Sequence, residues 1–100
     1  MNINKIEKGT ELIIELEGRL DTTTSPELEK ELKQSLRGVT SLILDMDKLD
    51  YISSAGLRVL LSAQKEMNKQ GSMLVKNVNE NIMEIFDVTG FVDILNIEGV

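Results

Sequence analysis

The apolar residues of this chain repeat with two different periods, and each period predicts a different kind of element. Between Glu11 and Glu17 the apolar residues Leu12, Ile14 and Leu16 recur at every second position, which predicts a strand with these three side chains on one face. The stretch Thr24–Glu27 then offers a hydroxyl cap, a first-turn proline and the glutamate of a capping box. A helix follows, with leucines at every fourth position (Leu28, Leu32 and Leu36), and Gly38 ends it.

The run Leu42–Leu44 lacks alternation, which predicts a strand covered on both faces. The other expected segments are a first strand near Ile3–Ile6, a helix from about Ser54 to Lys69 ending at Gly71, a strand at Met73–Val75, a third helix marked by Val78, Ile82, Ile85 and Phe86 and closed near Thr89–Gly90, and a last strand within Ile94–Ile97. The order is β-β-α-β-α-β-α-β. It predicts an α/β fold, with helices packed on a mixed β-sheet, in a single domain over residues 1–100.

Composition narrows the possible functions. The net charge of −6 argues against a direct nucleic-acid binder, which would carry a basic patch. The chain has no cysteine and no histidine, which argues against a disulfide, histidine-based catalysis and most zinc sites. We expect no metal site and no cofactor. No apolar run is long enough for membrane insertion, and no signal-peptide pattern begins the chain, so a cytoplasmic location is expected.

The most informative positions are two serines, Ser53 and Ser54, which lie between a buried strand and a helix. A hydroxyl at a helix start either caps the helix or can accept a phosphate, because the free N–H groups and the helix dipole tolerate negative charge. Asp21 follows the second strand and Ser54 follows the third. If these strands are parallel neighbours, both residues lie at one edge of the sheet. Arg58 comes four residues after Ser54 and shares its helical face.

The acidic residues Asp45, Asp47 and Asp50 follow the third strand and suggest metal or phosphoryl chemistry. A calcium loop counted from Asp45 would need glycine and glutamate where Asp50 and Gly56 stand, so that interpretation fails. Asp47 is interpreted as a solvated acid. A small hydrolase or phosphotransferase using Ser54 or Asp45 remains an alternative, but a serine nucleophile would need a lysine as its base. We therefore expect no catalytic residue and no enzyme activity.

Three segments together carry a family resemblance. They are Glu17–Asp21 before a Thr-Ser-Pro helix start, Leu44-Asp45 leading into Tyr51–Arg58, and Val88–Phe91 after the third helix. In this order they resemble the signatures of STAS domains of the anti-sigma factor antagonist family. The resemblance covers essentially the whole chain.

The resemblance implies a function and a set of site residues. Members of this type bind an anti-sigma factor that is also a serine kinase, which frees a sigma factor. The kinase phosphorylates a serine on the antagonist, which then dissociates, and a serine phosphatase resets it. The phosphorylated serine corresponds to Ser54, and the acid of the Gly-x-Leu-Asp motif corresponds to Asp21. The implied partner-binding residues are Asp21, Thr22, Ser53, Ser54, Ala55, Gly56 and Arg58.

The chain departs from the family pattern beside its candidate phosphoacceptor. Many phosphorylated members carry aspartate before the serine and serine or threonine after it, whereas this chain has Ser53 and Ala55. Other STAS domains serve in transporters or in lipid-trafficking complexes. A constitutive interaction subunit without phosphorylation is therefore the alternative function.

Overall fold

The computed structural model describes residues 1–99, which form a five-stranded sheet and three α-helices in the expected order. The elements are β1 (Asn2–Lys8), β2 (Glu11–Leu20), α1 (Ser25–Ser35), β3 (Ser41–Ile52), α2 (Ser54–Gln70), β4 (Ser72–Val78), α3 (Glu80–Thr89), a short 3-10 helix η1 (Phe91–Asp93) and β5 (Ile97–Gly99). The predicted α/β class and element order are confirmed.

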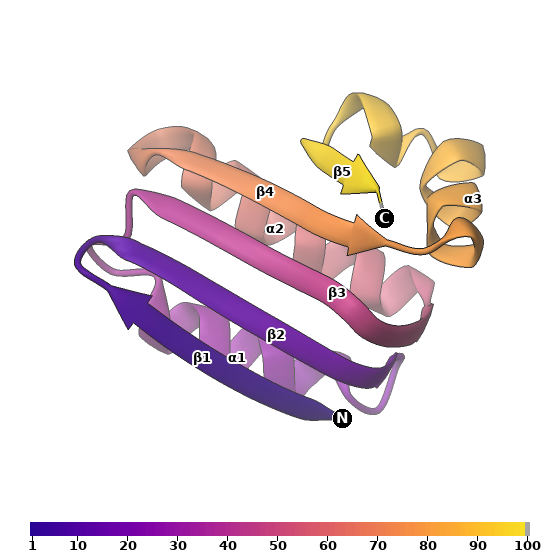
Figure 1. Cartoon of the computed structure of the whole chain (residues 1–100), viewed down its shortest axis with the longest axis horizontal. Coiled ribbons are helices and arrows are strands. Elements are labelled where there is room, and N and C mark those ends of the chain that lie inside the picture. The colour runs from indigo at the N-terminus through magenta and orange to yellow at the C-terminus, as the bar shows by residue number, and fades with distance from the viewer. Residues whose placement is uncertain (100) are drawn as a thin grey trace.

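The strands lie side by side in the order β1-β2-β3-β4-β5, with β1 antiparallel to β2 and every other pair parallel. Parallel neighbours require crossover connections, and α1, α2 and α3 supply them. Figure 1 shows α1 and α2 behind the sheet, and α3 beyond the end of β4. The view therefore looks onto the face of the sheet that no helix of residues 1–99 covers.

The core lies between the sheet and the helices and is mainly aliphatic. The alternating residues Leu12, Ile14 and Leu16 of β2 are each at most 1% exposed. Phe86 of α3 is also fully buried, and its ring stacks on Phe91 of η1 with the ring centres 6.5 Å apart. These contacts fix α3 against the rest of the domain.

The structure corrects several strand boundaries. β3 continues through the acidic residues to Ile52, so Asp45, Asp47 and Asp50 lie within a strand and not in a loop after it. The register between β2 and β3 shifts twice, which lets the two strands stay paired past these polar residues. Val78 belongs to β4, and the last strand is Ile97–Gly99 instead of a segment within Ile94–Ile97.

The expectation that the third strand is covered on both faces is wrong for the described residues. Leu42 and Leu44 are fully buried, whereas Ile43, which lies on the opposite face of the strand, is half-buried. None of the helices in residues 1–99 has the length and apolar character needed to cross a membrane.

Candidate functional site

The candidate site lies where β2 and β3 end at the same edge of the sheet. Leu20 is the register partner of Ile52, and the backbone N–H of Ser53 donates to the Leu20 carbonyl at 2.9 Å. β2 and β3 are therefore parallel neighbours, which is the condition under which Asp21 and Ser54 were expected to share an edge. Asp21 then begins the loop that leads to α1, and Ser53 joins β3 directly to α2. We call this edge the rim; it comprises residues 19–24 and 51–58.

The two serines of the rim have different surroundings. Ser53 is the cap residue of α2, and its Oγ accepts a hydrogen bond from the Gly56 N–H at 3.4 Å. Ser54 is the first residue of the helix and is exposed. The cap role thus belongs to Ser53, and the Ser54 hydroxyl faces solvent at a helix N-terminus, where a phosphate would be tolerated.

Gly56 is buried, and its role is close packing. A Cβ at this position would lie 2.8 Å from a side-chain carbon of Leu20 and of Ile52, and 3.0 Å from the Leu20 carbonyl oxygen. The first turn of α2 can therefore approach the end of β2 only because residue 56 lacks a side chain. Gly56 brings Ser54 close to the β2 loop, while the half-buried Ala55 keeps the surface small.

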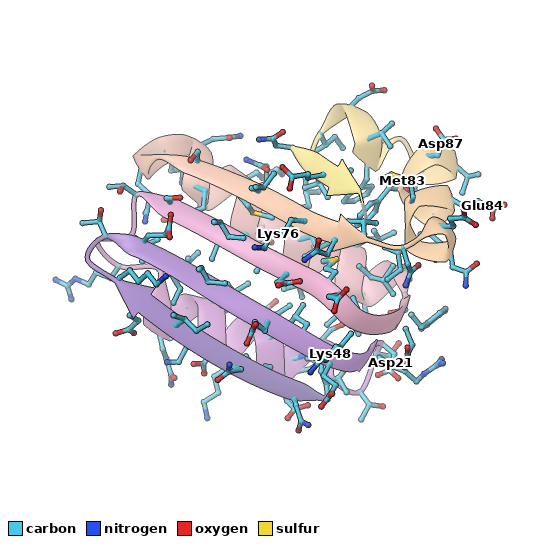
Figure 2. All side chains as sticks on the ribbon, viewed as in Figure 1. Asp21, Lys48, Lys76, Met83, Glu84 and Asp87 are labelled. Carbon is cyan, nitrogen blue, oxygen red and sulfur yellow. The ribbon has the colours of Figure 1, made fainter. Side chains whose placement is uncertain are left out.

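Asp21 holds the loop after β2 in place through its carboxylate. The Oδ1 atom accepts hydrogen bonds from the backbone N–H groups of Thr23 at 3.0 Å and Thr24 at 3.1 Å, and from the Thr24 hydroxyl at 3.2 Å. The Thr24 N–H lowers the pKa of Asp21 most, with help from Thr23, the Thr24 hydroxyl and the Arg19 charge. Asp21 is therefore a fixed negative charge, with exposed Thr22 beside it. Figure 2 shows it in the loop beyond β2.

The predicted capping box of α1 is wrong. Thr24 is the cap residue, but its hydroxyl accepts from the Asp21 N–H at 2.9 Å and donates to the Arg19 carbonyl at 2.6 Å. It makes no hydrogen bond to the helix N–H groups. The Thr24 hydroxyl is engaged by Asp21 and Arg19, so it does not cap the helix. Pro26 does occupy the first turn as expected.

The rim also contains an interaction that the sequence pattern does not predict. The Arg19 guanidinium lies 4.3 Å from the centre of the Tyr51 ring, and these residues are register partners on β2 and β3. Arg19 also reaches Asp21, with its Nε 3.7 Å from Oδ2. The strand register could have indicated this contact, but only once the shift between Gly18 and Arg19 was known.

Asp45 lies apart from the rim. Its Oδ1 accepts from the Asn77 amide and from the Asp47 N–H, both at 3.0 Å, on the open face of the sheet. Ile52 lies seven positions further along β3, a distance of roughly 20 Å. Asp45 and Ser54 therefore do not share a site. Among residues 1–99, no group of three or more acidic side chains is arranged to hold a metal ion.

Comparisons with known proteins place the chain in a family. The STAS domain model matches residues 2–99. The anti-sigma-B factor antagonist of Bacillus subtilis is 31% identical over 100 residues, which cover 97% of this chain and 92% of that protein. The chain belongs to the STAS domain family, and its relatives include anti-sigma factor antagonists.

Solved structures share this fold. An anti-sigma factor antagonist from Mycobacterium paratuberculosis superposes with a TM-score of 0.89 and 16% identity, covering 99% of this chain and 86% of that one. The Bacillus cell fate determinant SpoIIAA, solved in its phosphorylated form, gives a TM-score of 0.76 and 17% identity, covering 96% and 90%.

Proposed function

We propose that this protein is an anti-sigma factor antagonist whose binding is switched off by phosphorylation of Ser54. It binds an anti-sigma factor that is also a serine kinase and so releases a sigma factor in the cytoplasm. The observation that carries the proposal is the exposed Ser54 hydroxyl at the first residue of α2, beside a neighbour that already caps the helix. The relatives named as antagonists and the phosphorylated SpoIIAA structure support it.

The rim residues named here have three roles in this proposal. Ser54 accepts the phosphate, and a serine phosphatase removes it. The contact surface comprises Asp21, Thr22, Ser53, Ala55 and Arg58, whose side chains are exposed or half-buried. Gly56 is buried below this surface and lets the first turn of α2 pack against the end of β2. The chain supplies the phosphate acceptor, whereas ATP and catalysis belong to the kinase.

A phosphate on Ser54 would act mainly at the interface. It adds a charge of about −1.5 to −2 at neutral pH. On the free domain, the N-terminus of α2 stabilises this charge by roughly 0.3–1 kcal/mol, and the ionised Asp21 opposes it. Inside an interface water is excluded, and an unpaired charge costs several kcal/mol. Losing several kcal/mol of binding free energy lowers affinity by about a hundredfold or more.

The proposal is tested by phosphorylating the chain with the anti-sigma factor kinase of the same cell and ATP, and locating the phosphate by mass spectrometry. We expect it on Ser54 and expect no labelling of Ser54→Ala. The matched variant Ser53→Ala should still be labelled. A phosphate on Ser53 or a threonine would show that the assigned site is wrong. Equal partner binding by wild type, Ser54→Ala and Ser54→Asp would instead indicate a constitutive interaction subunit.

A further inference from the structure

One row of side chains on the open face of the sheet breaks the polar pattern around it. Ile6, Ile13, Ile43 and Leu74 are successive register partners on β1, β2, β3 and β4. All four are half-buried, although no helix of residues 1–99 covers this face. We call these four residues the aliphatic row.

A sheet with one open face normally carries polar residues there. The rows on either side follow that rule. One comprises Lys8, Glu11, Ser41 and Ser72, and the other comprises Asn4, Glu15, Asp45 and Lys76. The aliphatic row is thus a stripe of roughly 14 Å across four strands, with polar side chains along both sides. Figure 2 shows Lys76 on this face.

The face is hollowed and mainly acidic at the second polar row and beyond it. A cavity of about 210 Å³ is lined by Asn2, Asn4, Glu15, Leu16, Glu17, Asp45, Asp47 and Lys48. The Asn2 amide donates to Glu17 Oε1 at 2.7 Å, and the Asn4 amide donates to Glu15 Oε1 at 2.6 Å. Two glutamates are therefore oriented by cross-strand amides. Four carboxylates face the single ammonium of Lys48 in this hollow.

We propose that the open face binds a basic amphipathic segment of a protein partner. Its apolar side chains would cover the aliphatic row, and its lysines or arginines would lie over the hollow against Glu15 and Glu17. Charge complementarity selects this occupant. A second copy of the chain, with its net charge of −6, would bring acidic groups toward the same hollow. This surface is separate from the rim, so the inference goes beyond the proposed function.

The direct test is NMR of the ¹⁵N- and methyl-labelled chain with a synthetic amphipathic helical peptide of leucine and lysine, about 14 residues long. We expect shifts at the aliphatic row and at Glu15 and Glu17. A peptide of the same composition, scrambled to remove its apolar stripe, should bind at least tenfold more weakly. Shifts confined to α3 or to α1 and α2, or no binding, would overturn the proposal.

Two double variants separate the apolar and the charged contributions. Ile13→Thr with Ile43→Thr shortens the aliphatic row but keeps β-branched residues, and Glu15→Gln with Glu17→Gln removes charge but keeps an acceptor for each asparagine. Each pair should weaken peptide binding at least tenfold, whereas Ser54→Ala should leave it unchanged. The glutamine pair keeps the test valid if the threonine pair fails to fold.

Unchanged affinity in a folded double variant would overturn the proposal. So would dimerisation of the wild-type chain through the aliphatic row, detected by sedimentation. Labelling of Ser54 by the kinase reads out the rim alone, so failure of this inference and failure of the proposed function are distinguishable.

Discussion

At the residue scale, neighbouring serines at the start of α2 do different things. Ser53 caps the helix, while Ser54 leaves its hydroxyl in solvent. Removing an N-cap side chain costs about 1 kcal/mol, whereas an exposed surface change stays within roughly 0.5 kcal/mol. We therefore expect Ser53→Ala to unfold at lower urea than Ser54→Ala. A larger loss for Ser54→Ala would contradict the division of roles.

The packing of Gly56 gives a second prediction. Gly56→Ala places a methyl group 2.8 Å from carbons of Leu20 and Ile52, both of which are buried. Overpacking of this kind typically costs about 1–3 kcal/mol. Urea unfolding should detect that loss, whereas Ser62→Ala on the exposed side of α2 should be nearly neutral. Full stability of Gly56→Ala would show that the first turn of α2 moves away from the ends of β2 and β3 at little cost.

The hydrogen bonds to Asp21 give a prediction about pH. Because the Thr24 and Thr23 N–H groups hold its pKa below the ordinary value of 3.8, the ionised form stabilises the fold. This contribution is present above pH 3.8 and is lost as the pH falls through the lowered pKa. The stabilities of wild type and Asp21→Asn should therefore converge in acid. NMR titration of the Asp21 carboxylate should give a midpoint below 3.8; a midpoint at or above it would contradict the hydrogen-bonded loop.

At the element scale, Asn79 fastens the start of α3 to the sheet. Its Oδ1 accepts from the Ile82 N–H at 2.9 Å and its amide donates to the Leu49 carbonyl of β3 at 3.0 Å. Asn79→Ala loses a cap and a tertiary hydrogen bond, so we expect a loss of about 1–3 kcal/mol in urea unfolding. Asn79→Asp keeps the cap and should recover part of the stability. Equal stability of Asn79→Ala and Asn79→Asp would show that the cap contributes nothing, and wild-type stability of Asn79→Asp would show the same of the link to β3.

Sequence periodicity predicted the helices better than the strands. The leucine spacing identified α1, and the end of α2 at Gly71 was also correct, because helix faces and stop signals are local. The full length of β3 was missed because its second half is acidic and stays in the sheet through register shifts. The capping box failed for a related reason: Thr24 hydrogen-bonds to Asp21, and no local pattern predicts that choice.

The candidate site was predictable to the extent that it depends on topology. Alternating strands and helices indicate that Asp21 and Ser54 share an edge if their strands are parallel neighbours, and β2 and β3 meet that condition. The Arg19–Tyr51 contact and the division of roles between Ser53 and Ser54 depend on exact register and backbone geometry. These details come from tertiary structure, and the spacing of residues along the chain does not contain them.

At the scale of the whole molecule, phosphorylation should act locally without refolding the domain. In the free protein, the stabilisation of the phosphate by the helix dipole and its repulsion by Asp21 nearly cancel. Phosphorylated and unphosphorylated chains should therefore differ in amide NMR only around Ser54 and Asp21, with melting points within a few degrees. Shifts reaching Ile82–Phe86 would point to a conformational switch, because Ile82 and Phe86 are fully buried in the core.

The affinity of the anti-sigma factor for the two forms of the chain tests the central claim most directly. Calorimetry would compare unphosphorylated protein with protein phosphorylated at Ser54, using Asp21→Lys as a second perturbation of the rim. We expect the phosphate to weaken binding by about a hundredfold or more, and Asp21→Lys to weaken it both by reversing the charge and by loosening the loop that the Asp21 carboxylate holds. Equal affinities for the phosphorylated and unphosphorylated chains would contradict the account.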